Sequence, residues 1–159
     1  MLAQAAKKSG YLPLVLDLFA DEDTQQASEY CMQVSTLSLL DIQAPIEKLL
    51  KQYAIQYAVY GSGLETHLST LQWLESVCSI CGNSADVLGQ YLNPSLLFPL
   101  LQQLDIAYPA VQFTLPTLPL DYLIKSPYQS GGVGIQFAHR SLNKGEYYQQ
   151  WIRFIKLTI

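Results

Sequence analysis

The chain has 159 residues, 50% of them hydrophobic, and a formal net charge of −4. This size predicts one compact domain, or one and part of a second. The acidic balance and the lack of a basic cluster argue against nucleic-acid binding, and no apolar run is long enough to span a bilayer. The three cysteines have no disulfide spacing, and the N-terminus has no cleavable apolar segment, so we expect a cytoplasmic protein.

Helical and extended patterns alternate along the first hundred residues. Such alternation predicts crossover units, and hence a parallel sheet with helices on both faces. The expected elements, in order, are a helix at 2–9 closed by Gly10, a buried strand at 11–17, a helix from Asp21 or Asp23 to about residue 30, a weak strand at 31–35, a helix from Asp41 to residue 53, a buried strand at 55–63, an amphipathic helix at 66–77 with Leu68, Leu71, Trp73 and Leu74 inward, a strand at 78–83, and a helix at 94–106 with Pro94 in its first turn.

The pattern changes after Ile106. Residues 113–120 are proline-rich and extended, which indicates a linker. The segments 121–127, 132–138 and 145–152 then read as antiparallel strands. The chain is therefore expected to hold an α/β domain at 1–108, followed at 109–159 by a linker and the start of a β-rich unit.

Lys125 stands at the end of an apolar run, just before a loop that carries Gly131, Gly132 and Gly134. This is not a P-loop, in which the lysine follows the glycines at the start of a helix. The order instead predicts a hairpin loop that folds over a phosphate chain, with backbone N–H groups and one cation as ligands. The alternative is a surface hairpin with a lysine at its rim, and spacing alone favours that alternative.

Three other motifs have structural interpretations that we favour over functional ones. The segment GSGLET, residues 61–66, lacks the third glycine of a dinucleotide loop, and we favour a turn with a helix cap over an anion site. Cys78 and Cys81 fall on opposite faces of a strand, which favours buried structural thiols over a metal site. The acidic cluster at residues 17–23 favours a solvated loop with helix caps over a Mg²⁺ or ribose site.

Several segments together resemble one family. They are LAQAAKKSGYLPLVLDLFADEDT, AVYGSGLE, CGN, the linker at Pro109, YLIKSPYQSGGVGI and YYQQWI. They resemble the ATP-grasp superfamily of ligases, in the branch similar to biotin carboxylase and carbamoyl-phosphate synthase. The resemblance covers Leu2 to Ile152, and Lys125 with the Gly131-Gly132 loop is its most specific part.

The resemblance implies a fold and a chemistry. Residues 1–108 would form an α/β domain before the ATP-grasp unit, and residues 109–159 the start of an α+β ATP-grasp subdomain. A complete relative would use ATP and Mg²⁺ to convert a small carboxylate to an acyl phosphate, which an amine-type nucleophile then attacks. The implied ATP-binding residues are Lys125, Ser130, Gly131, Gly132 and Gly134, and the implied substrate-binding residues are Gly61, Ser62, Gly63 and Glu65.

The sequence departs from the family pattern in ways that predict a fragment. The family's first strand, which is central in the sheet, would precede Leu2, and the Mg²⁺ ligands would follow Ile152. We therefore expect no ligase activity from these residues alone, and oligomers formed through unpaired strand edges. Two alternatives stay open: an independent nucleotide-binding module, against which the lack of an early glycine loop counts, and a non-catalytic interaction protein.

Overall fold

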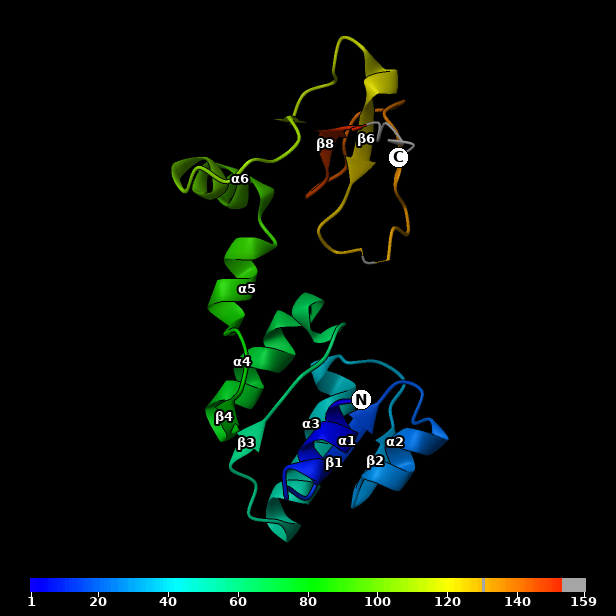
Figure 1. Ribbon diagram of the computed structural model, residues 1–159, viewed down its shortest axis with the longest axis vertical. Helices are drawn as coiled ribbons and strands as arrows, with labels where there is room; N and C mark the ends of the chain where they lie inside the picture. The colour runs from blue at the N-terminus through cyan, green and yellow to red at the C-terminus, as the bar shows by residue number, and fades with distance from the viewer. Residues whose placement is uncertain (130, 153–159) are drawn as a thin grey trace, which may run out of the picture. The chain divides into compact units, whose positions relative to one another are not determined.

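The computed structural model describes residues 1–129 and 131–152, and it divides into two compact units (Figure 1). Unit 1 runs from Met1 to Leu88, and unit 2 from Gly89 to Ile159. Within the described part of the chain, no helix has the length and apolar character needed to cross a membrane. The functional boundary expected at residue 108 is a different division and stays a prediction.

Helices and strands alternate along unit 1 in the predicted order. The one α-helix that the sequence patterns do not predict is α5, which follows the last strand of the unit and ends at Tyr91, past the unit boundary. The elements are α1 (Leu2–Lys8), β1 (Leu14–Asp17), α2 (Glu22–Ala27), β2 (Tyr30–Gln33), α3 (Leu39–Gln52), β3 (Tyr57–Ala58), the 3₁₀ turn η1 (Leu64–Thr66), α4 (Leu68–Val77), β4 (Ser79–Ile80) and α5 (Ala85–Tyr91).

The strands of unit 1 form two separate parallel pairs. Leu14 of β1 is in register with Tyr30 of β2, and Tyr57 of β3 is in register with Ser79 of β4. No ladder joins the two pairs among the described residues, so each strand has one unpaired edge. The strands are parallel, as predicted, but the described residues do not form one continuous sheet.

The prediction of a buried strand at residues 55–63 is wrong in extent and in burial. Only Tyr57 and Ala58 are in a ladder, and the side chains of Tyr57 and Val59 are 59% and 60% exposed. A continuous apolar run indicates a strand that is covered on both faces. Here no other element of the described chain covers the side chains of Tyr57 and Val59, so they remain largely in solvent.

The core of unit 1 is built around α4. Leu71 and Leu74 of this helix are buried with Leu64 of η1 and with Ala85 and Leu88 of α5. Leu68 and Trp73 pack against the same cluster, so the predicted inward face of the helix is confirmed. Burial of one such leucine contributes roughly 1.5–3 kcal/mol relative to exposure.

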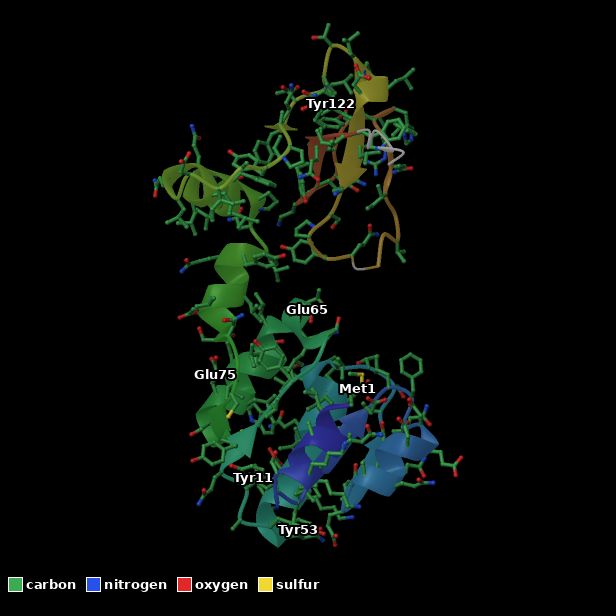
Figure 2. All side chains as sticks on the ribbon, viewed as in Figure 1. Met1, Tyr11, Tyr53, Glu65, Glu75 and Tyr122 are labelled. Carbon is green, nitrogen blue, oxygen red and sulfur yellow. The ribbon has the colours of Figure 1, made fainter. Side chains whose placement is uncertain are left out.

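Polar contacts attach α4 to its neighbours. Thr70 is fully buried, and its hydroxyl donates to the carbonyl oxygen of Leu37 at 2.9 Å. The carboxylate of Glu75, labelled in Figure 2, accepts the N–H of Ala85 at 2.8 Å, where α5 begins. These two bonds fix the helix against the segment after β2 and against α5.

The prediction that Gly10 terminates α1 is confirmed. Gly10 has φ +84°, and its N–H donates to the carbonyl oxygen of Lys7, while the N–H of Tyr11 donates to that of Ala6. This is the hydrogen-bond pattern of a Schellman motif, in which glycine adopts the left-handed conformation at little cost.

Unit 2 contains a helix and a four-stranded antiparallel sheet. The three predicted strands are confirmed, and a fourth, β5, which the sequence patterns do not predict, lies just before the proline-rich segment at 113–120. The strand order is β5-β8-β6-β7, and Figure 1 shows β6 beside β8. The elements are α6 (Pro94–Gln103), β5 (Val111–Gln112), the 3₁₀ turn η2 (Pro119–Asp121), β6 (Tyr122–Lys125), β7 (Gln136–Phe137) and β8 (Tyr147–Gln150).

One face of this sheet carries the core of unit 2. Ile124 of β6 and Tyr148 of β8 are directly opposite each other, and both are buried with Ala138. The Tyr148 hydroxyl donates to the carbonyl oxygen of Arg140 at 2.6 Å. Because side chains alternate along a strand, Lys125 lies on the other face of the sheet.

Candidate functional site

The loop that follows Lys125 closes a β-hairpin, as the sequence predicts. Leu123 of β6 is in antiparallel register with Phe137 of β7, and Lys125 is the last residue of β6. The loop therefore leaves the sheet directly after the lysine and returns to it at Gln136.

Three glycines give this loop its backbone shape. Gly131, Gly132 and Gly134 have φ values of +65°, +80° and +74°, the left-handed region that other residues adopt only at a cost. A Cβ atom at Gly131 or Gly132 would meet nothing within 4 Å, whereas one at Gly134 would collide with the side chain of Gln129. Ser130, the remaining predicted phosphate ligand, lies outside the described residues.

Lys125 has a neutral partner. Its ammonium donates to the side-chain oxygen Oε1 of Gln149 at 2.6 Å, and both side chains are half-buried. The one ion pair among the described residues joins Arg140 and Glu146 at 2.7 Å, so no described carboxylate neutralises Lys125. The charge therefore remains available to an anion.

Lys125 and Gly132 line one pocket of unit 2, with a volume of about 230 Å³. Gly131 and Gly134 are in the same loop but are not among the lining residues. The volume is below the roughly 300–1,000 Å³ of typical ligand pockets, which suits part of a nucleotide better than a whole one. The lining residues are Tyr91, Pro94, Leu97, Phe98, Lys125, Ser126, Pro127, Gln129, Gly132, Val133, Ile135 and Tyr147.

Part of the pocket wall is aromatic, because Tyr91, Phe98 and Tyr147 line it. The rings of Phe98 and Tyr147 meet edge to face with centroids 5.3 Å apart, and Tyr108 contacts Phe98 at 5.1 Å. Burial, and then the charge of Tyr91, raise the pKa of the Tyr147 phenol, which therefore stays neutral near pH 7.

Sequence reasoning missed this wall and the partner of Lys125. A signal for Tyr147 and Gln149 was present, because their spacing of two places both on one face of β8. The antiparallel register then sets Tyr147 opposite Lys125. Phe98 carried no separate signal, since a buried aromatic residue on a helix is usual in any core.

The second predicted site lies in unit 1, with Gly61, Ser62 and Gly63 in the loop after β3 and Glu65 in η1. Figure 2 labels Glu65. Its carboxylate accepts the N–H of Gly63 at 2.5 Å and the hydroxyl of Ser62 at 3.4 Å. Gly63 has φ +108°, and a Cβ there would lie 3.1 Å from Leu37. These contacts fit the turn that we favoured, but neither η1 nor α4 has a side-chain cap hydrogen bond. The substrate role of the segment stays a prediction.

The acidic cluster acts locally. One carboxylate oxygen of Asp17 accepts the N–H groups of Phe19 at 2.7 Å and Ala20 at 2.9 Å. Asp21 is at the predicted N-cap of α2, but its side chain makes no cap hydrogen bond. Among residues 1–129 and 131–152, no three histidine, cysteine or acidic side chains come together in a group that could hold a metal ion.

The prediction that both Cys78 and Cys81 are buried is wrong for Cys81. Cys78 is half-buried at the end of α4, and burial raises the pKa of its thiol, whereas Cys81 is exposed. The reason is the short β4, which covers only residues 79 and 80, so the two cysteines flank the strand rather than belong to it.

No family model matches the sequence, and no curated protein does either. Solved structures match over nearly the whole chain. The biotin carboxylase domain of Hydrogenobacter thermophilus 2-oxoglutarate carboxylase, in complex with MgADP, ADP and bicarbonate, is 10% identical with a TM-score of 0.68, over 94% of this chain and 40% of that one.

Two further structures give the same result. Biotin carboxylase from Campylobacter jejuni, in a β,γ-ATP complex, is 14% identical with a TM-score of 0.66, over 95% of this chain and 42% of that one. N5-carboxyaminoimidazole ribonucleotide synthetase from Thermus thermophilus is 14% identical with a TM-score of 0.66, over 97% of this chain and 44% of that one.

At these identities the likeness establishes the fold. The chain has the mixed α/β fold of ATP-grasp enzymes of the biotin carboxylase kind, which confirms the resemblance at the level of fold. It spans about two fifths of the length of the structures it matches.

Proposed function

We propose that this chain is part of an ATP-grasp ligase, and that Lys125 and the loop at 130–134 bind ATP phosphates. The observation that carries the proposal is the position of Lys125, at the end of β6, on a pocket that it shares with Gly132. The likeness to structures solved with ADP and an ATP analogue supports it.

The residues of the chain fit a phosphate group. The Lys125 ammonium supplies a positive charge without a described carboxylate partner. The left-handed glycines allow backbone N–H groups to approach anionic oxygens closely, which is how loops of this kind bind phosphates. Ser130 belongs to the proposed set because it directly precedes Gly131 in the sequence.

The described residues do not fit Mg²⁺, because they offer no cluster of three suitable ligands. In the whole enzyme, Mg²⁺ would neutralise charge on the triphosphate. We propose that the complete protein activates a small carboxylate as an acyl phosphate and transfers it to an amine-type nucleophile, and that the 159 residues alone do not perform this reaction. Their span of about two fifths of the matched structures supports the second statement.

The test is a titration of the purified chain with a non-hydrolysable Mg·ATP analogue. Lys125→Ala removes the cation, and Lys144→Ala is the matched control, because Lys144 is an exposed lysine of unit 2 outside the pocket lining. A charge-assisted hydrogen bond contributes about 1.5–3 kcal/mol, so Lys125→Ala should weaken binding about 10- to 150-fold. Equal affinities of the two variants would refute the phosphate role of Lys125. ADP release by the wild-type chain, lost in Lys125→Ala, would refute the proposed inactivity.

We also propose that the two parallel pairs of unit 1 belong to one sheet, which a further strand between β1 and β3 completes. The unpaired edges of β1 and β3 support this, as does the exposure of Tyr57 and Val59. In the isolated chain these edges should associate between copies. Light scattering should then show a molecular mass that rises with protein concentration. Hydrogen exchange of the β1 amides should become slower as the copies associate.

A monomer at every concentration, with the amides of β1 and β3 already protected, would contradict this proposal. The same measurement addresses the alternative function. Association through these edges without any nucleotide binding would favour a non-catalytic interaction module.

A further inference from the structure

The partner of Lys125 is fixed by the pairing of β6 with β8. Lys125 is opposite Tyr147, and Leu123 is opposite Gln149, so the four side chains share the face that Ile124 and Tyr148 do not occupy. Lys125 and Gln149 are therefore diagonal neighbours, a separation that two long side chains span. The hydrogen bond of 2.6 Å between them follows from this register.

We propose that Gln149 is a positioning residue, which holds the Lys125 ammonium in place at the pocket lining without neutralising its charge. The proposal rests on the phosphate-binding function proposed above. A neutral amide oxygen accepts one of the three ammonium hydrogens, so two donors and the full charge remain for an anion. A carboxylate at the same place would form an ion pair with the lysine and compete with phosphate oxygens for it.

Fixing the lysine has an energetic consequence. Its stem of four carbons has many rotamers, and ordering such a side chain costs conformational entropy. The hydrogen bond to Gln149 already orders the lysine side chain in the folded protein, before any anion binds. Loss of the bond should therefore weaken anion binding even though the charge of Lys125 is unchanged.

Two variants separate position from charge. Gln149→Met keeps the length of the side chain and removes the acceptor, whereas Gln149→Glu keeps the shape and adds a negative charge. The matched control is Gln150→Glu, which adds the same charge at the next position of β8, where the exposed side chain points to the other face. Thermal unfolding of each variant verifies that the sheet remains folded.

The probe is inorganic tripolyphosphate, titrated at several salt concentrations. We expect Gln149→Met to weaken binding about threefold to tenfold with an unchanged salt dependence, because the number of charges at the site is the same. We expect Gln149→Glu to weaken it at least about tenfold at low salt and to flatten the salt dependence, as Lys125→Ala should. Gln150→Glu should change affinity less than about twofold.

The outcomes distinguish this inference from the function on which it rests. If Lys125→Ala weakens binding but both Gln149 variants bind like the wild type, Gln149 has no positioning role and the phosphate function stands. If Gln149→Glu and Gln150→Glu weaken binding equally, the effect is general charge repulsion and the inference is wrong. If the wild type does not bind tripolyphosphate, or Lys125→Ala changes nothing, both proposals fail.

Discussion

The sheet that carries Lys125 should depend on Ile124, the residue next to it in β6. Ile124 is 1% exposed and lies opposite Tyr148 in the core of unit 2. Truncation of a buried isoleucine to alanine costs about 2–5 kcal/mol, through lost transfer energy and the cavity left behind. For a domain of this size, about 1 kcal/mol shifts the midpoint of thermal unfolding by about 4–8 °C, so Ile124→Ala should lower it by roughly 10 °C or more.

The two tryptophans allow unit 2 to be followed separately. Trp73 is in α4 of unit 1, and Trp151 follows β8 in unit 2, where its ring contacts Phe137 with centroids 5.0 Å apart. In a Trp73→Phe background, the fluorescence of Trp151 reports the unfolding of unit 2. Leu120→Ala is the control, because Leu120 is 74% exposed and its truncation should change stability by less than about 0.5 kcal/mol.

The reasoning is refuted if Ile124→Ala and Leu120→Ala unfold at the same midpoint. That result would mean that the Ile124–Tyr148 face is not the core of unit 2, and the assignment of Lys125 to the opposite face would lose its basis. A lower midpoint for Ile124→Ala alone supports both.

Three further predictions concern stability. The hydrogen bond from the Arg140 guanidinium lowers the pKa of the Glu146 carboxyl to about 2, so this pair should stabilise unit 2 at pH values above the ordinary glutamate pKa and lose that contribution as the pH falls toward 2. Glu146→Gln should flatten the acid side of a pH–stability curve recorded with Trp151 fluorescence, and an unchanged curve would contradict the pairing. Thr70→Val should destabilise unit 1 by about 1–3 kcal/mol, because the carbonyl of Leu37 loses the donor that the buried Thr70 supplies, and Trp73 fluorescence would measure this change. A change below about 0.5 kcal/mol would show that the bond is dispensable. Gly134→Ala should lower the stability of unit 2 by about 1–2 kcal/mol, because alanine is strained in the left-handed conformation, and the collision of its Cβ with Gln129 adds to this loss. Equal stability of this variant and the wild type would show that the loop adopts another backbone conformation.

Much of the secondary structure could be predicted because its causes are local. Gly10 ends α1 through its own backbone conformation, and Asn93 accepts the N–H of Ser95 at the start of α6, where Pro94 occupies the first turn. The inward face of α4 follows from helical periodicity alone. The hairpin around Lys125 follows from two apolar runs and the glycines between them.

The failures concern features that depend on distant residues. The apolar run around Tyr57 predicts burial, but burial depends on distant elements that cover both faces of the strand, which a local pattern does not report. The helix α5 was missed because it is short and because its start depends on a distant residue. The carboxylate of Glu75, ten residues earlier in the chain, accepts the first N–H of α5. The exposure of Cys81 follows from the two-residue length of β4, which pairing with β3 sets.

Part of the candidate site could be predicted from the sequence. Lys125 and the glycines were identified from their order, and the structure places Lys125 and Gly132 on one pocket. Gln149 required the register of β6 against β8, which depends on tertiary packing rather than on local sequence. The phosphate role of these residues stays a prediction until ligand binding is measured.

The most direct test of that role is residue-resolved nuclear magnetic resonance of the chain with a non-hydrolysable ATP analogue and Mg²⁺. The account predicts that the amide signals of Gly131, Gly132 and Gly134 shift on titration, that those of Gly61 and Gly63 shift less, and that Lys125→Ala abolishes the shifts of the loop. Shifts confined to unit 1, or loop shifts that persist in Lys125→Ala, would contradict it.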